Sequence, residues 1–144
     1  PIDPFVRFAT PDETDAVLPA AAHMFTEEIG YPPYYGSPRG YRQGVAALIA
    51  ARHTVVRVEC GEVVFKADVG STAYGVAQVQ GVWLHPDLRG RGMAAPAMAA
   101  ATQLFMTEVA PTLSLYVNDF NIAARATYLR CGFREVGSFA TVLM

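Results

Sequence analysis

Hydrophobic positions change their spacing along the chain, and each change predicts a different element. Residues 6–9 alternate between apolar and polar side chains, as a short strand does. Thr10, with the proline and acids that follow it, forms a typical helix start, so a helix is predicted to about residue 29, with a kink or break at Pro19. Apolar residues recur at helical spacing over residues 39–52, which predicts a second helix.

β-Branched residues dominate the middle of the chain and predict a sheet. Residues 54–59 and 62–69 are interpreted as two strands joined by a tight turn at Cys60-Gly61, and a third strand is expected after Gly70, over residues 73–84. The remaining predicted elements are a helix over 92–108, a strand over 112–117, a helix over 121–131, and strands over 133–136 and 139–143. The order β-α-α-β-β-β-α-β-α-β-β mixes hairpins with a β-α-β crossover, so we expect an α/β fold with a mixed sheet and helices on both faces.

Composition narrows the class of protein. The 144 residues are 52% hydrophobic and 17% charged, which fits one domain, residues 1–144, with a buried core. The net charge of −2 argues against a nucleic-acid-binding or membrane-surface protein. The apolar stretch over residues 93–106 is too short to span a bilayer, and no signal peptide is visible, so a cytoplasmic protein is expected.

Metal chemistry is not predicted by the cysteines and histidines. Cys60 and Cys131 lack the spacing of a metal site or a disulfide framework. His23, His53 and His85 are scattered along the chain. We therefore expect no metal cofactor.

A glycine-rich segment follows the third predicted strand and opens a helix. Gly90 and Gly92 remove side chains from the first amides of that helix, which lack internal partners and lie at the positive end of its dipole. Arg89 and Arg91 add positive charge, so the segment is suited to bind a diphosphate. The loose dinucleotide fingerprint, ending at Ala95, also matches, but it needs its first glycine directly after the strand, and five residues intervene here. Taken alone, the segment also fits an ordinary strand-to-helix loop.

The helix predicted over residues 121–131 has clear ends. Asn121 is a good N-cap, and Gly132 followed by Phe133 is typical of a Schellman C-cap. Asn121 and Tyr128 are seven positions apart, two helical turns, and therefore share a face with Ala124.

Together, the two segments resemble the signatures of the GNAT superfamily of N-acetyltransferases. The glycine loop is similar to Q/R-x-x-G-x-G/A, and the later helix is similar to N-x-x-A-x-x-x-Y-x-x-x-G-F. The matching residues are Arg89, Gly92 and Ala94 in the first signature, and Asn121, Ala124, Tyr128, Gly132 and Phe133 in the second. The resemblance is close over residues 54–144, and it implies a GNAT-type mixed, mostly antiparallel sheet with acetyl-CoA (coenzyme A) as co-substrate.

The resemblance also implies roles for individual residues. The CoA pyrophosphate would be bound beside Arg89 by the loop, whose contributing amides belong to Gly90, Arg91, Gly92, Met93 and Ala94. The backbone of Val82 and Leu84 would pair with the pantetheine arm like an added strand, and an amide near Leu84 would stabilise the oxyanion. Asn121 and Ala124 would line the CoA channel. Tyr128 would protonate the leaving thiolate.

The general base is the least defined group. Many family members carry a glutamate early in the strand before the loop, whereas Gln78 stands near that place here, and an amide can only orient a water. Glu28 or Glu27, at the end of the first helix, is the alternative. Acceptor selectivity is expected in the loop over residues 31–35 and in the final hairpin around residues 138–141.

The predicted activity is transfer of an acetyl group from acetyl-CoA to a primary amine of a small molecule or peptide, by direct attack in a ternary complex. Two alternatives are a catalytically weak or inactive acyl-CoA-binding regulatory module, favoured by Gln78, and a structural partner domain without a cofactor. A homodimer is left open. Stretches near residues 24–30 and 64–70 resemble a GNAT subgroup in which a second acetyltransferase-like domain precedes this one, and the start at Pro1 fits a fragment of such a protein.

Overall fold

The computed structural model describes residues 2–29, 38–116, 122–135 and 141–143. The elements in chain order are β1 (Arg7–Phe8), η1 (Pro11–Glu13), α1 (Thr14–Ile29), α2 (Pro38–Ala50), β2 (Thr54–Glu59), β3 (Glu62–Ala73), β4 (Val76–Leu84), η3 (Pro86–Leu88), α3 (Ala94–Glu108), β5 (Thr112–Tyr116), α4 (Ile122–Arg130), β6 (Arg134–Glu135) and β7 (Thr141–Leu143). The predicted order of helices and strands is confirmed.

In the described part of the chain, the strands form one seven-stranded sheet in the order β1-β2-β3-β4-β5-β7-β6. Strands β4 and β5 run parallel, joined by the crossover helix α3, and the other recorded pairs are antiparallel. The sheet is therefore mixed and mostly antiparallel, as expected. None of the described helices is both long enough and apolar enough to cross a bilayer.

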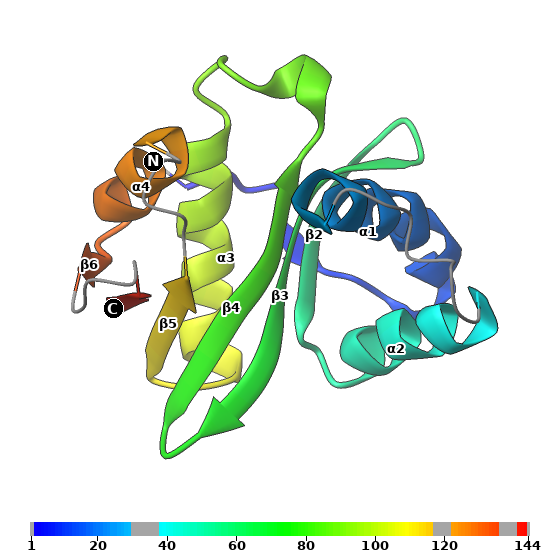
Figure 1. The fold of residues 1–144 in the computed structure, drawn as a ribbon, viewed down its shortest axis with the longest axis horizontal. Helices are drawn as coiled ribbons and strands as arrows, with labels where there is room; N and C mark the ends of the chain where they lie inside the picture. Colours follow the sequence, from blue (N-terminus) through cyan, green and yellow to red (C-terminus); the bar gives the residue numbers. More distant parts are fainter. Residues whose placement is uncertain (1, 30–37, 117–121, 136–140, 144) are drawn as a thin grey trace.

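Helices pack on both faces of the sheet and create two separate cores (Figure 1). Helices α1 and α2 cover one face, where Val17 and Ile49 pack against Val56 and Trp83 of the sheet. On the other face, Met98 and Phe105 of α3 pack against alternate residues of β3. Those alternate residues are Phe65, Ala67 and Val69. The alternation means that the residues between them, Lys66 and Asp68, face α1 and α2.

Helix α1 continues through Pro19, so of the kink or break expected there, the break is wrong. Proline removes one intrahelical hydrogen bond, which would have joined its amide to the carbonyl of Asp15. Both residues are exposed, so water can hydrate that carbonyl in place of the missing bond.

Strand β3 also continues past the point where it was expected to end. Gly70 is an extra residue in β3, because Val69 pairs with Val79 while Ser71 pairs with Gln78. The chain reverses instead at Tyr74 and Gly75, both with positive φ (53° and 77°). Gly70 therefore marks a bulge within the strand, not a turn.

The first hairpin is as expected. Strands β2 and β3 pair antiparallel across Cys60 and Gly61, whose φ angles are 52° and 78°. Two consecutive positive φ angles are those of the type I′ turn that suits the twist of a hairpin.

Candidate functional site

Strand β4 has an open edge along its second half. Residues 76–79 pair with β5, but residues 80–84 pair only with β3 among the described strands. In Figure 1, β4 extends well beyond the tip of β5 toward the glycine loop. Backbone groups along this half of β4 are thus placed where an extended ligand could pair with them.

A bulge at Gly81 lies where β4 leaves β5. Asp68 pairs with Gln80 and Lys66 pairs with Trp83, so β4 has one more residue than β3 across this step. Gly81 has φ 61°, a conformation that glycine adopts without strain. The bulge shifts the alternation of β4. Val79 and Val82 both pack toward α3, while Trp83 packs toward α1.

The loop after β4 is fastened to the end of the strand. His85 caps η3, because its Nδ1 accepts the N–H of Asp87 at 3.1 Å and its carbonyl accepts the N–H of Leu88 at 2.9 Å. Arg89 turns back toward the strand and donates from Nε to the carbonyl of Leu84 at 2.8 Å. The glycines that follow are thereby held at a defined distance from the open edge.

The glycine loop presents an unobstructed set of backbone amides. Gly90 and Gly92 have φ 77° and 73°, and a Cβ atom at either position would meet nothing within 4 Å. Within the described ranges, the amides of residues 90–94 donate to no protein acceptor. Helix α3 begins at Ala94, so its positive dipole end faces the same space. This arrangement is suited to bind an anion.

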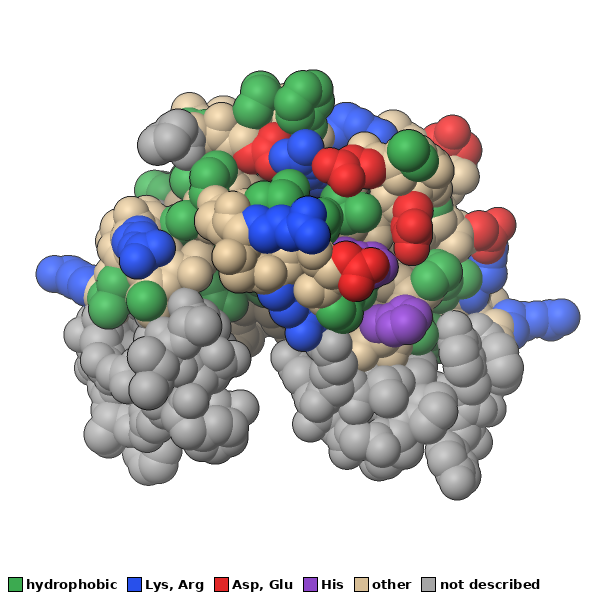
Figure 2. All heavy atoms as spheres, turned by 90° about the horizontal axis from the view of Figure 1, so that it is seen from above, with side chains coloured by type: hydrophobic (Ala, Val, Ile, Leu, Met, Phe, Trp, Pro, Cys, Tyr) green, Lys and Arg blue, Asp and Glu red, His purple; other side chains and the backbone are tan. Residues whose placement is uncertain are grey.

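Basic side chains accompany these amides. Arg89 and Arg91 are both exposed. Figure 2 looks onto this end of the molecule and shows Lys and Arg side chains near its middle, with Asp and Glu side chains gathered on one side. Because Arg89 and Arg91 are next to Gly90 and Gly92 in the chain, their positive charge is close to the free amides of the loop.

Tyr128 lies in the same core cluster as the open half of β4. Its side chain is 9% exposed, and the cluster also contains Val82 and Leu84 as partly buried members. Its ring packs edge-on against Phe133, with centroids 6.1 Å apart. The structure thus places this predicted site residue and the predicted strand residues around the same core.

The end of α4 has the predicted Schellman geometry. Phe133 donates its N–H to the carbonyl of Tyr128 at 3.1 Å, Gly132 donates to Leu129 at 3.1 Å, and Gly132 has φ 100°. The Sγ atom of Cys131 lies 3.5 Å from the carbonyl oxygen of Ala95. This contact connects the end of α4 to the first turn of α3. Burial raises the pKa of the Cys131 thiol, which favours this packing role over a reactive thiolate.

Gln78 lies apart from the glycine loop. It sits in the closed half of β4, opposite Ser114 of β5, and its Oε1 accepts a hydrogen bond from Ser71 at 3.3 Å. Glu28 lies in the last turn of α1 and Ala124 in α4, but their side chains fall outside the described residues, as does all of Asn121. Residues 31–35 and 138–140, expected to select the acceptor, also lie outside them.

Sequence reasoning missed a buried ion pair beside the bulge. Lys66 Nζ lies 2.7 Å from Asp68 Oδ2 and 2.7 Å from the carbonyl oxygen of Gly81. Lys66 is 1% exposed and Asp68 is 7% exposed. Their spacing of two inside a β-branched run was the available signal, since it places both charges on one face of a strand.

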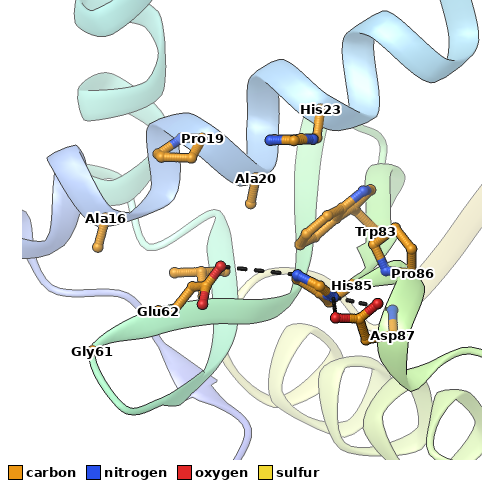
Figure 3. Close-up of a pocket in the computed structure, with 11 residues that line it drawn as sticks. Ala16, Pro19, Ala20, His23, Gly61, Glu62, Trp83, His85, Pro86 and Asp87 are labelled. Carbon is orange, nitrogen blue, oxygen red and sulfur yellow. Dashed lines mark hydrogen bonds and ion pairs between the residues drawn. The ribbon is translucent and has the colours of Figure 1, made fainter.

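A second feature that the sequence does not predict is a pocket on the α1 side of the sheet (Figure 3). It has a volume of about 410 Å³ and lies between α1, the β2–β3 turn and the end of β4. The His85 ring lies between the carboxylates of Glu62, 3.9 Å from Nε2, and Asp87, 3.8 Å from Nδ1. The His23 ring lies tilted by 40° beside that of Trp83, with ring centroids 6.1 Å apart. Among the described residues, no three His, Cys, Asp or Glu side chains are grouped so that they could hold a metal ion.

Solved structures with the same fold include several acetyltransferases. A GCN5-related N-acetyltransferase from Kribbella flavida aligns with a TM-score of 0.70 and 20% identity over 90% of this chain and 32% of that one, so this chain spans about a third of its length. A ribosomal-protein-alanine N-acetyltransferase from Brucella melitensis aligns with a TM-score of 0.75 and 17% sequence identity over 96% of both chains. The PaiA N-acetyltransferase from Thermoplasma acidophilum, in complex with coenzyme A, aligns with a TM-score of 0.69 and 12% sequence identity. The alignment covers 96% of this chain and 95% of that one.

Sequence comparison adds the family. No curated protein matches the chain. The family model described as acetyltransferase (GNAT) family matches residues 18–133, which include the glycine loop, the open half of β4 and α4. Because that match covers most of the sequence, the chain belongs to the acetyltransferase (GNAT) family.

Proposed function

We propose that the protein binds acetyl-CoA and transfers its acetyl group to a primary amine by direct attack in a ternary complex. The observation that carries this proposal is the unobstructed set of backbone amides at residues 90–94, placed at the start of α3 and at the end of an unpaired strand edge. Similar folds bound to coenzyme A or acetyl-CoA, in Thermoplasma acidophilum and Brucella melitensis, support the choice of ligand.

The loop fits the pyrophosphate of coenzyme A. Gly90 and Gly92 leave open space where a side chain would stand, so phosphate oxygens can approach the amides closely. The contributing amides are those of Gly90, Arg91, Gly92, Met93 and Ala94, with the guanidinium groups of Arg89 and Arg91 adding charge. Such charge-assisted contacts are short and strong compared with neutral hydrogen bonds.

The open edge of β4 fits the pantetheine arm. Val82 and Leu84 lie in the half of the strand that pairs only with β3, so their backbone groups can pair with the two amides of pantetheine. We assign Asn121 and Ala124 to the wall of the same channel. The bound co-substrate supplies an activated acetyl thioester at the end of this arm.

The reaction forms one C–N bond and breaks one C–S bond. The attacking amine must be neutral and loses a proton, while the departing thiolate gains one. A backbone amide in the open half of β4 stabilises the oxyanion, a contribution typically worth about 100- to 1000-fold in rate. Tyr128 provides the proton for the thiolate. The reference pKa of a tyrosine, near 10, is close enough to that of a thiol, about 8.5, for this transfer to need no large shift.

Removal of the amine proton is assigned to water oriented by Gln78 or to Glu28. An α-amine, with a pKa of about 8, needs less help to become neutral than a lysine side chain with a pKa of about 10.4. The acceptor is proposed to be the primary amine of a small molecule or a peptide. It is proposed to approach from the α1 side of β4. Residues 31–35 and 138–141 are proposed to select it.

Two measurements test the proposal, first for binding of the co-substrate and then for acetyl transfer. Calorimetric titration and thermal unfolding with coenzyme A and acetyl-CoA test binding. A ligand specific to the folded state at 100 times its dissociation constant adds about 2.7 kcal/mol of stability. A panel of amino acids, polyamines, aminoglycosides and peptides with thiol detection then tests transfer. Absence of any stabilisation by either ligand contradicts the proposal.

A CoA-binding regulatory module is the second candidate, because the Gln78 amide occupies a place where many family members carry a carboxylate and bonds to Ser71. This candidate shares the binding site but lacks transfer. Normal acetyl-CoA binding with no thiol release across the acceptor panel supports it over the enzyme.

A further inference from the structure

The buried ion pair of Lys66 and Asp68 contacts the bulge of β4 directly. Asp68 also accepts the hydroxyl of Thr54, from Oγ1 to Oδ1 at 2.8 Å, so the carboxylate is held from two sides. A Cβ atom on Gly81 would lie 2.5 Å from Asp68 Oδ2 and 2.8 Å from Lys66 Nζ. The network therefore requires glycine at the bulge and packs against its backbone.

The third partner of Lys66 is a main-chain group. Its Nζ donates to the carbonyl of Gly81 at 2.7 Å, on the side of the sheet covered by α1 and α2. The peptide that joins Gly81 to Val82 is trans, since no described peptide bond is cis. In a trans peptide the C=O and N–H bonds point in opposite directions, so the N–H of Val82 points away from the ammonium.

Burying a lysine and an aspartate is costly, and such a pair often stabilises a fold no more than apolar residues of similar volume would. Stability alone is therefore a weak explanation for the pair. Its direct contact with the one peptide that precedes Val82 offers a more specific explanation. A cation on the carbonyl oxygen also polarises the peptide and makes its N–H a stronger donor.

We infer that Lys66 is a positioning residue for acetyl transfer. By holding the Gly81 carbonyl toward α1, Lys66 fixes and polarises the N–H of Val82, which then donates to the thioester carbonyl oxygen of acetyl-CoA at the open edge of β4. Asp68 pairs with the ammonium, and the Thr54 hydroxyl donates to Asp68. This inference rests on the proposed function, and it narrows the oxyanion donor to Val82.

The test uses coenzyme A and [1-¹³C]acetyl-CoA as probes. In the wild-type protein, the carbonyl stretch of the bound thioester should lie at lower frequency than that of the free thioester, because a hydrogen bond weakens the C=O bond. The variant Thr54→Val/Lys66→Met/Asp68→Val replaces the network with apolar side chains and should remain folded. It should return the carbonyl stretch toward the free value and weaken acetyl-CoA binding roughly three- to tenfold, as loss of one hydrogen bond does. Coenzyme A lacks the thioester carbonyl and so cannot form this hydrogen bond. The affinity of the variant for coenzyme A should therefore stay within about twofold of the wild-type value.

Two further comparisons separate positioning from stability. Val56→Ala creates a cavity opposite Lys66 on β2, so it lowers stability without removing the donor to Gly81, and its carbonyl stretch should match the wild type. Lys66→Met and Asp68→Asn both break the ion pair, but only Lys66→Met removes that donor. A shifted stretch in Lys66→Met and a wild-type stretch in Asp68→Asn support the inference, and these single variants decide the matter if the triple variant does not fold.

The outcomes distinguish the two proposals. A wild-type protein that binds neither probe overturns the proposed function and the role of Lys66 with it. A wild-type protein that binds acetyl-CoA while folded Lys66 variants keep its carbonyl stretch and affinity ratio overturns the role of Lys66 alone.

Discussion

Arg89 Nε lies 2.8 Å from the carbonyl oxygen of Leu84, which ties the start of the glycine loop to the last residue of β4. The two proposed parts of the CoA site, a strand edge for pantetheine and a loop for pyrophosphate, are thus joined by one side-chain hydrogen bond. The family signature accepts glutamine or arginine at this position. Both side chains can donate to such a carbonyl, so the shared property is the donor and not the charge.

We predict that Arg89→Met weakens coenzyme A binding by about tenfold, because it removes a charge-assisted hydrogen bond. Arg89→Gln, which keeps a donor, should lose clearly less affinity. Isothermal titration calorimetry with coenzyme A measures both. Arg39→Met makes the same change of charge at an exposed position on α2 and serves as the control. Equal affinity in wild type and Arg89→Met would exclude the anchoring role.

Gly92→Glu is predicted to abolish detectable coenzyme A binding, because it places a carboxylate where the phosphate oxygens would lie. Gly61→Glu is a matched control. Both glycines have positive φ, 73° and 78°, and open space at the Cβ position, but Gly61 lies in the β2–β3 turn. Each substitution should cost about 1–2 kcal/mol of stability, measured by chemical denaturation, as a non-glycine residue at positive φ does. Retention of binding by Gly92→Glu would remove the loop from the proposed site.

Much of this fold could be predicted from local sequence, because its signals are local. The Cys60-Gly61 turn and the cap at Gly132 each depend on a glycine beside a periodic segment, and both predictions are confirmed. Gly70 shows the limit of such reasoning. A glycine in a strand fits a turn or a bulge equally well, and only the pairing of Ser71 with Gln78 distinguishes them.

The geometry of the candidate site was predictable from sequence at the glycine loop and less so in β4; its role in binding stays a prediction. The glycine loop has a pattern in consecutive residues, whereas the bulge at Gly81 appears only when β3 and β4 are placed in register. The contact of Lys66 with Gly81 joins residues 15 positions apart and depends on that register. Charges at alternate positions of a strand could have indicated a buried pair, but not the peptide that it binds.

Tyr128→Phe is predicted to lower turnover by at least tenfold while changing acetyl-CoA affinity by less than twofold. The substitution removes a proton donor, and general acid catalysis typically contributes about 100- to 10,000-fold. Phenylalanine preserves the packing against Phe133, so the fold should persist. Initial rates with the best acceptor of the panel, together with calorimetric affinity, give the comparison. Tyr74→Phe, at the fully exposed β3–β4 turn, should behave as wild type. An unchanged rate in Tyr128→Phe would remove the hydroxyl from catalysis.

A carboxylate in η1, just before α1, makes the stability of the domain depend on pH. Hydrogen bonds from Arg7, at 2.7 Å to each carboxylate oxygen, and from the Thr10 amide lower the pKa of Glu13 from 4.5 to about 2. A lowered pKa means that the unfolded chain binds this proton more readily than the folded domain does. The stabilisation is therefore fully present above about pH 4.5 and is lost as the pH falls toward 2.

Glu13→Gln should accordingly be less stable than the wild type at neutral pH, and the difference should shrink to near zero by pH 2. The Arg7 side chain is 49% exposed and that of Glu13 18%, so water and salt reach the pair from the arginine side. The difference at neutral pH should therefore be modest and should decrease with added salt. Urea denaturation at several pH values measures it. Glu108→Gln, at an exposed position in the last turn of α3, controls for general loss of a carboxylate and should show a much smaller pH-dependent difference. A Glu13→Gln difference that is constant from pH 7 to pH 2 would show that the Arg7 contact contributes nothing through the charge of Glu13.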